Sequence, residues 1–175
     1  KMGIGIPAMW MRGGTSKALY FRREDLPNDI CSRDQLLLKI MGSPDKRQID
    51  GVGGADPLMS KVAIISSSED SAADVDYLFL QVSVDKAEVS DSQGCGNVLA
   101  GVGPFAIERG LVRAGSPITT ARIRMCNTGE IAEVVISTPG GSVTYDGYET
   151  IDGVPGASAA IPIFFSNLAG SNCGS

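Results

Sequence analysis

Residues 98–107 are apolar or small at every position, and this run constrains the fold of the chain more than any other feature. A helix that is hydrophobic on all sides belongs in a protein core. The run therefore predicts a buried helix over residues 97–109, around which the rest of the chain must fold. Pro104 is expected to kink or divide this helix, because proline removes a backbone donor, and Gly110 is expected to end it.

The remainder of the chain has the pattern of short strands joined by tight turns. Glycine is frequent, at 22 residues, and aromatic residues make up only 6% of the chain, a mixture more typical of strands and turns than of a helical bundle. One further helix is predicted over residues 32–41, with Ser32 as its cap and Gly42 at its end. Strands are predicted at residues 4–11, 18–22, 61–65, 75–84, 119–126, 130–137, 142–145 and 161–165.

These elements place the chain in the α+β class. Its 175 residues suit one domain, which we expect to span residues 1–166. No internal repeat that would indicate a solenoid or propeller is present. Residues 167–175 are small and polar, and we expect them to form a linker toward a second domain that is missing from this chain.

Composition and charge exclude several classes of function. The net charge of −5 and the pI near 4.7 make nucleic acids and anionic membrane surfaces poor partners, because both bind basic protein surfaces. No apolar stretch approaches the roughly 20 residues that cross a bilayer, and the start of the chain does not resemble a signal peptide, so a cytoplasmic location is predicted.

The chain has no histidine, which excludes Ser-His-Asp and Cys-His mechanisms confined to it. The four cysteines are widely separated, which argues against a zinc site. A disulfide framework is not expected in a cytosolic chain of this size.

Three glycine-rich segments contain or precede side chains with reactive or anion-binding chemistry, namely Ser16, Lys61 and Cys95 in chain order. Glycines allow backbone N–H groups to point at an anion. Cys95 also stands at the amino end of the predicted buried helix, where the helix dipole favours a thiolate and free N–H groups favour a carboxylate. A thiolate beside a bound carboxylate is suited to proton transfer.

Each of these features also has an ordinary structural explanation. A single cysteine is more often a small buried hydrophobic residue, glycine-rich loops are more often turns, and Lys61 before an apolar strand is usually a solvated strand end. The dinucleotide pattern G-x-G-x-x-G is incomplete, since Asp56 stands where its last glycine would be. The residues alone therefore predict an α+β domain with a candidate anion site and a candidate reactive cysteine.

Seven ordered segments that together span almost the whole chain resemble the PrpF-type isomerase family. They are Pro7–Lys17, Met41–Asp45, Gln48–Ile64, Asp74–Phe79, Cys95–Ala106, Asn127–Gly129 and Ile151–Gly156. The resemblance implies the diaminopimelate epimerase-like fold, in which each of two similar α+β domains wraps a curved, mixed or antiparallel sheet around a central buried helix. The active site of that fold lies in the cleft between the domains, and this chain corresponds to the first of them.

The resemblance also implies an activity. By this likeness the chain is expected to belong to a cofactor-independent isomerase, without a metal, that moves a proton and shifts a double bond in a small unsaturated polycarboxylic acid. The residues look most like the 4-oxalomesaconate tautomerases of gallate breakdown, with cis-trans or allylic isomerisation of 2-methylaconitate or aconitate as the alternative. The implied partners are a small polycarboxylate, the second domain of the same parent chain and, if that domain is absent, a second copy of the chain in a homodimer.

Site roles follow from the resemblance, position by position. Cys95 is expected to be an acid/base residue or to hold the substrate at that position. Lys61 is expected to be the partner base or the cation that stabilises an enolate-like intermediate. The expected substrate-binding positions are Gly14, Thr15, Ser16, Ser60, Gly96, Asn97 and Asp85, of which Asp85 is expected to orient Lys61.

Two other functions are compatible with the same fold. An epimerase that inverts a stereocentre with two thiols needs a second cysteine facing Cys95. Nothing in this chain supplies one in a suitable place, because Cys126 lies in a strand-like stretch and Cys173 in the tail. Outside enzymes, the alternative is a half-domain that serves binding or scaffolding without catalysis. Whether the parent reading frame continues into a second domain of similar pattern distinguishes this non-catalytic alternative from an enzyme.

Overall fold

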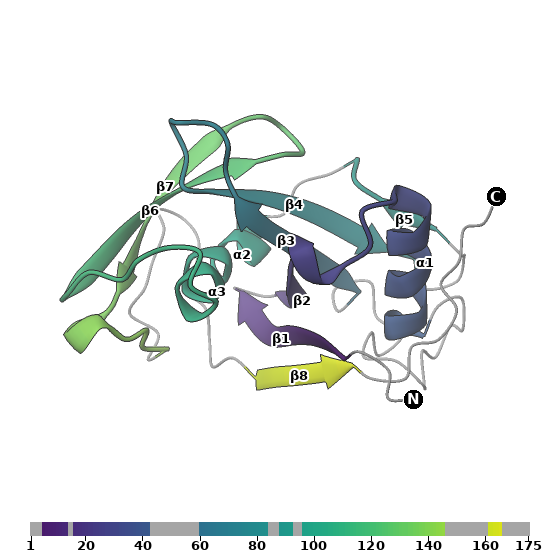
Figure 1. Ribbon diagram of the computed structural model, residues 1–175, viewed down its shortest axis with the longest axis horizontal. Helices are drawn as coiled ribbons and strands as arrows, with labels where there is room; N and C mark the ends of the chain where they lie inside the picture. The colour runs from purple at the N-terminus through teal and green to yellow at the C-terminus, as the bar shows by residue number, and fades with distance from the viewer. Residues whose placement is uncertain are drawn as a thin grey trace.

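The computed structural model describes residues 5–13, 16–42, 60–83, 88–92, 96–145 and 161–165. Eight strands of this part form one mixed sheet, with α1 on one face and α2 and α3 on the other (Figure 1). The strands are β1 (Ile6–Gly13), β2 (Ser16–Arg22), β3 (Lys61–Ser67), β4 (Val75–Val82), β5 (Val89–Ser90), β6 (Ile118–Met125), β7 (Ile131–Ser137) and β8 (Ile161–Phe165). The helices are α1 (Ile30–Met41), α2 (Gly96–Leu99) and α3 (Val102–Glu108), and two 3₁₀ turns are η1 (Arg23–Asp25) and η3 (Pro139–Gly141).

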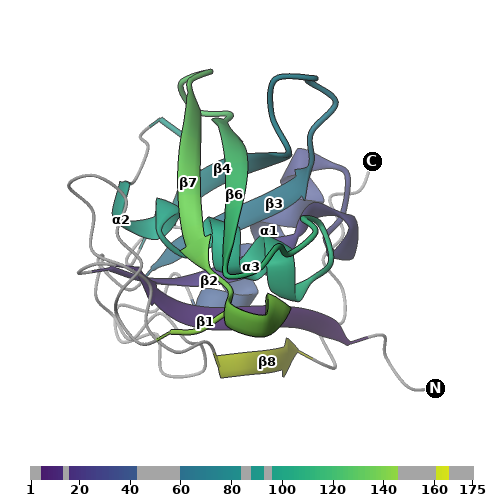
Figure 2. The same cartoon turned by 90° about the vertical axis from the view of Figure 1, so that its left-hand side faces the viewer.

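The strand order is β7-β6-β4-β3-β2-β1-β8, with β5 paired beside β4. The β2–β3 and β4–β6 pairs are parallel, and the other pairs are antiparallel. In Figure 2 the strands turn from upright in the β6–β7 hairpin to horizontal in β1 and β8, so the sheet wraps around α3. The predicted α+β architecture, a curved mixed sheet around a buried helical segment, is confirmed.

Both faces of the central strands are buried. On β4, Val75, Tyr77 and Phe79 pack with α2 and α3, whereas Leu80 and Val82 pack with α1. Alternate residues of a strand point to opposite faces, so we call the two sides of the sheet the α2/α3 face and the α1 face. The alternation predicted for residues 75–84 describes the α1 face alone, because a strand covered on both sides is apolar on both.

The predicted buried helix is two short helices rather than one. α2 and α3 are separated by a turn at Ala100 and Gly101, and residues 102–106 of α3 are all buried. The division comes before Pro104 and not at it, because a continuous helix would require a backbone donor from Pro104 to the carbonyl of Ala100. As the third residue of α3, Pro104 needs no such partner. The prediction of burial is confirmed. The helix is divided, which was one of the two outcomes expected from Pro104, but the division lies at Ala100 and Gly101 and not at the proline.

α1 begins two residues earlier than predicted and has a different cap. Asp29 caps it by accepting a hydrogen bond of 2.8 Å from the backbone N–H of Ser32, so the assignment of the cap to Ser32 is wrong. Aspartate is favoured at this position because its carboxylate also meets the positive end of the helix dipole. Gly42 ends the helix with a φ of 79°, as predicted.

The β1–β2 hairpin is tighter than predicted. Arg12 pairs with Lys17, and Gly13 pairs with Ser16, across the two strands. Ser16 and Lys17 therefore lie within β2 and not in a loop, because the backbone ladder continues through them.

Residues 142–145 form no strand, contrary to prediction. The chain turns at η3, where Gly140 and Gly141 have φ values of 67° and 86°, and Val143 and Tyr145 then pack against the core of the α2/α3 face. The strand predicted at residues 161–165 is confirmed as β8, which pairs with β1. The linker predicted over residues 167–175 lies outside the described residues.

Two cysteines lie in the described part of the chain. Cys31, in α1, is disulfide-bonded, and Cys126 is a free, exposed thiol. The argument against disulfides from a cytosolic location and the size of the chain is therefore wrong for Cys31. None of the helices in the described ranges is long and apolar enough to span a membrane. The same ranges contain no group of three or more histidine, cysteine or acidic side chains arranged to hold a metal ion.

Candidate active site

Lys61 is the first residue of β3, and alternation along the strand places its side chain on the α2/α3 face. Its Nζ donates a hydrogen bond of 3.0 Å to Oε1 of Gln81, the residue opposite it on β4. The same amine lies 5.3 Å from the centroid of the Phe79 ring, a cation–π distance. No ion pair to this amine is found among the described residues. The amine is therefore held by a neutral amide and a ring, and its charge is available to an anion.

Ser16 lies on the same face, in the neighbouring strand. β2 and β3 are parallel with Ala18 opposite Lys61, and Ser16 stands two residues before Ala18, about 7 Å along the strand. The residue is only 2% exposed, yet its hydroxyl makes no hydrogen bond within the part of the chain that the structure describes. A nearly buried hydroxyl close to an amine is suited to binding one carboxylate of a small acid.

Ser60 is fully buried directly before Lys61. Its backbone carbonyl accepts two hydrogen bonds, one of 2.9 Å from the N–H of Val82 and one of 3.1 Å from Nε2 of Gln81. The residue thus joins the start of β3 to the end of β4. Its clearest contribution to the α2/α3 face is this carbonyl, which holds the Gln81 amide.

α2 lies over β1 and β2 on the α2/α3 face. The Tyr20 hydroxyl donates a hydrogen bond of 2.6 Å to the carbonyl of Val98. Gly101, directly after α2, is packed so closely that a Cβ there would lie 2.6 Å from Cζ of Tyr20 and 2.8 Å from Sδ of Met11. The absence of a side chain at this position lets the helical segment approach the sheet.

The structure brings part of the predicted site to one face of the sheet. Ser16 and Lys61 lie there, and Gly96 and the half-buried Asn97 form the start of α2 above the same face. Cys95 is joined directly to Gly96 in the chain. Four of the predicted positions lie outside the described residues: Gly14, Thr15, Asp85 and Cys95.

Gln81 and Phe79 were not predicted as site residues. Their contact with Lys61 depends on the register of β3 against β4, which joins positions 20 residues apart. The sequence gives one indication of a role for Gln81, which is that this polar residue stands between the buried Leu80 and Val82.

Asn127 supports this arrangement from beyond the end of β6. Its side-chain Oδ1 accepts a hydrogen bond of 2.9 Å from the N–H of Phe79, and its Nδ2 donates to the Phe79 carbonyl at 3.0 Å. Nδ2 also donates to the carbonyl of Asp91 at 2.8 Å, and Asp91 precedes Cys95 by four residues. One asparagine thus fixes the backbone under the Lys61 amine to the segment that leads to Cys95.

Comparison with models of known families matches residues 3–175 to the family described as PrpF protein. The chain belongs to the PrpF family. Its PrpF relatives match it over nearly its whole length. It is 64% identical over 168 residues to a (4E)-oxalomesaconate Delta-isomerase of Novosphingobium sp., and 58% identical over 169 residues to a 4-oxalomesaconate tautomerase of Pseudomonas putida. These alignments cover 96% and 97% of this chain but 47% of each relative. The chain therefore spans about half the length of the curated relatives it matches.

Solved structures place this PrpF chain in a known fold. A methylitaconate-delta-isomerase superposes with a TM-score of 0.80 at 48% sequence identity, over 90% of this chain and 41% of that chain. A hydroxyproline epimerase from Agrobacterium vitis superposes with a TM-score of 0.52 at 14% identity, over 79% and 39%. The second likeness concerns the fold alone. Together they confirm the predicted diaminopimelate epimerase-like fold.

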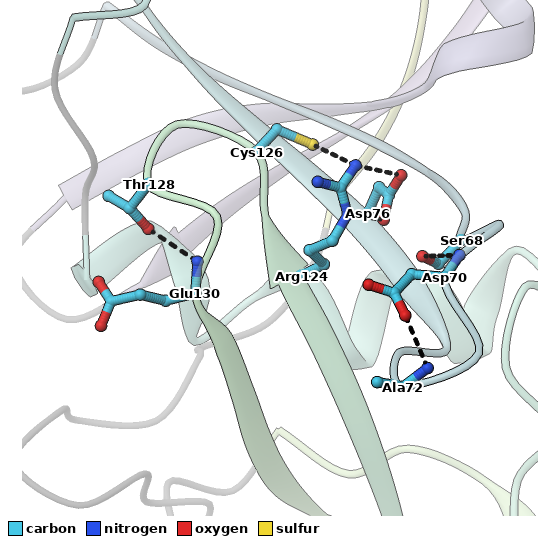
Figure 3. A network of polar contacts seen from close by, with 8 residues as sticks. All are labelled: Ser68, Asp70, Ala72, Asp76, Arg124, Cys126, Thr128 and Glu130. Atoms are coloured by element: carbon cyan, nitrogen blue, oxygen red, sulfur yellow. Dashed lines mark hydrogen bonds and ion pairs between the residues drawn. The ribbon is translucent and has the colours of Figure 1, made fainter.

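A second polar cluster of the PrpF chain lies at the other end of β4, on the α1 face (Figure 3). Arg124 of β6 donates two hydrogen bonds of 3.0 Å to the carboxylate of Asp76, its neighbour on β4. These two residues line a cavity of about 230 Å³ with Arg23 and Cys126, among others. The sheet separates this cavity from Lys61, so the cluster does not belong to the candidate active site.

We expect Asp76→Asn to lower the melting temperature near neutral pH and to have no effect in strong acid. Burial alone would raise the pKa of Asp76, but hydrogen bonds from Arg124 and Ser68 outweigh it and hold the pKa below its usual value. Such a carboxylate stabilises the fold above the unfolded-chain pKa of roughly 3.9, and this contribution is lost as pH falls through the lower folded pKa. Thermal unfolding of both proteins from about pH 2 to about pH 7 measures the effect. A difference that stays constant over this range contradicts it.

Proposed function

We propose that this chain is the first of two domains of an isomerase that moves a proton within 4-oxalomesaconate. The observation that carries the proposal is the order of sequence identities. They are 64% and 58% with proteins named for oxalomesaconate, against 47% with a 3-methylitaconate isomerase and 42% with a 2-methyl-aconitate isomerase. The half-length coverage of these relatives supports a second domain that completes the site.

The proposed reaction is a keto–enol tautomerisation without a cofactor. A base removes a proton from the carbon beside the keto group, the electron pair of that C–H bond forms the new C=C bond, and negative charge develops on the keto oxygen. A proton delivered to that oxygen completes the enol, so the atoms of the substrate balance. Such a step needs a positioned base and a cation or hydrogen-bond donors at the developing oxyanion.

The residues on the α2/α3 face support this chemistry. In the proposal, the Lys61 amine meets the developing oxyanion or acts as the base, and Cys95 is the other member of the acid/base pair. The Ser16 hydroxyl binds one substrate carboxylate together with Gly14 and Thr15. The charge of Lys61, which is not used in an ion pair within the described ranges, supports an anionic substrate.

The setting of this activity is also part of the proposal. We infer a cytoplasmic enzyme of gallate breakdown, from the resemblance to tautomerases of that route. The contributions of Ser60, Gly96, Asn97 and Asp85 to substrate binding, and assembly into a homo-oligomer, belong to the proposal on the same ground.

The experiment that tests the function compares three acids with the full-length protein. The ultraviolet absorbance of 4-oxalomesaconate, 3-methylitaconate and 2-methylaconitate reports their conversion. We expect kcat/KM to be at least about tenfold higher for 4-oxalomesaconate, because a pocket built for a polar substrate group discriminates against analogues that lack it. Preference for another of the acids would replace the proposed substrate. No conversion of any of them would overturn the isomerase proposal.

A further inference from the structure

We propose that Gln81 is a positioning residue for Lys61, which fixes the direction of the amine while leaving its positive charge for the substrate. The inference rests on the proposed function, in which Lys61 meets an anionic group of the substrate. Gln81 is not among the positions that the family resemblance supplies. Its role follows from the pairing of β3 with β4, where Lys61 and Gln81 are directly opposite.

The hydrogen bonds of the Gln81 amide determine its orientation. Nε2 donates to the carbonyl of Ser60 at 3.1 Å and to the carbonyl of Val82 at 3.5 Å, and Oε1 accepts a hydrogen bond of 3.0 Å from Nζ of Lys61. The reversed amide would set an NH₂ group against the ammonium and an oxygen against the carbonyl, and both contacts would be repulsive. The oxygen is therefore held toward Lys61 by the backbone of the residue that precedes Lys61.

The aromatic ring of Phe79 is the second group that contacts the Lys61 amine. Phe79 lies two residues before Gln81 on the same face of β4, with its ring centroid 5.3 Å from Nζ of Lys61. The backbone of Phe79 is itself fixed by two hydrogen bonds with the side chain of Asn127, which accepts one from the Phe79 N–H and donates one to the Phe79 carbonyl. The amine thus has one polar and one aromatic contact, both on a strand that is anchored at this point.

The neutral amide has a consequence that a carboxylate would not share. Glutamate at position 81 would also accept a hydrogen bond from Lys61, but it would neutralise the ammonium and set a negative charge beside bound carboxylates. It would also place an oxygen against the carbonyl of Ser60. Methionine has a similar length but adds no negative charge and no oxygen. It would leave the Lys61 amine without the hydrogen-bond acceptor that Gln81 supplies. Gln81→Met therefore tests the direction of the amine, and Gln81→Glu tests the effect of neutralising its charge.

Steady-state kinetics of the full-length protein on 4-oxalomesaconate test the proposal. We expect Gln81→Met to lower kcat by about tenfold or more with a small change in KM, because a misplaced catalytic group slows the chemical step. We expect Gln81→Glu to raise KM by about tenfold or more, because like charges oppose binding. The matched control is Gln35→Met on the exposed side of α1, which should behave as wild type. A kcat for Gln81→Met and a KM for Gln81→Glu both within threefold of wild type would overturn the proposal.

A second measurement does not depend on turnover. Trace acetylation with acetic anhydride, followed by peptide mass spectrometry, compares the reactivity of Lys61 with that of Lys39 in the same molecule. We expect the Lys61 rate to rise at least about twofold in Gln81→Met, because the amine loses a hydrogen bond, while the Lys39 rate stays unchanged. An unchanged Lys61 rate would overturn the positioning role. If the wild type converts none of the acids but the labelling rate rises as expected, the proposed function fails and the positioning role stands.

Discussion

Lys61→Met is expected to lower kcat/KM on 4-oxalomesaconate by roughly 100-fold or more, the usual loss when an acid/base group is removed. The amine is the only lysine nitrogen seated on the α2/α3 face within the described residues, and Gln81 and Phe79 hold it there. Methionine retains the length and the apolar stem of the side chain but supplies neither a proton nor a positive charge. The kinetics of the full-length variant, with its melting temperature, measure the effect.

The matched control for this variant is Lys39→Met on α1. Lys39 is exposed on the other side of the sheet, so its loss should leave kcat/KM unchanged. A Lys61→Met protein that melts like wild type and retains its activity would remove Lys61 from the mechanism. Equal losses in both lysine variants would attribute the effect to overall charge and not to the site.

Gly101→Val is expected to destabilise the protein by about 1–3 kcal/mol, the usual cost of overpacking a core. A Cβ at this position would lie 2.6 Å from Cζ of Tyr20 and 2.8 Å from Sδ of Met11, and both side chains are fully buried. The backbone of Gly101, with φ of −90° and ψ of −10°, is open to any residue, so the loss comes from space alone. Differential scanning calorimetry of the full-length protein measures it.

Gly129→Ala is the control that separates space from backbone strain. Gly129 has a φ of 81° with nothing within 4 Å of an added Cβ, so alanine there costs only the strain of the left-handed conformation, about 1 kcal/mol. Gly101→Ala also tests the close packing, through the direction in which it changes the stability of the protein. Without a clash, alanine in place of glycine would stabilise a backbone of this kind by reducing the freedom of the unfolded chain. A rise in melting temperature for Gly101→Ala would show that the α2 segment is not tightly packed against Tyr20.

Much of the fold is predictable from hydrophobic pattern. The apolar run over residues 98–107 indicates burial whatever its exact geometry, and the apolar stretches of the strands indicate a sheet. The details that fail depend on single atoms. The break before Pro104 depends on one missing N–H, and the start of α1 depends on which of two side chains, Asp29 or Ser32, accepts the first hydrogen bond.

The candidate site is only partly predictable, because its geometry is set by register. Ser16 and Lys61 stand 45 positions apart in the sequence, and the parallel pairing of β2 with β3 brings them to one face. The partner of Lys61 was expected to be Asp85, a charged residue of the right type. The structure gives Gln81 as an acceptor for the amine, and Asp85 as an orienting residue stays a prediction. Nothing in the local sequence distinguishes the two before the β3–β4 register is known.

A crystal structure of the full-length protein with a saturated tricarboxylate, which has no double bond to shift, is the most direct test of the site. We predict that one ligand oxygen lies within hydrogen-bond distance, about 3 Å, of Nζ of Lys61 and that a ligand carboxylate oxygen lies within the same distance of the Ser16 hydroxyl. Gln81 would keep its hydrogen bond to Lys61 in that complex. A ligand bound away from the α2/α3 face, for example in the cavity between Asp76 and Arg23, would contradict the assignment of the active site to Lys61 and its neighbours.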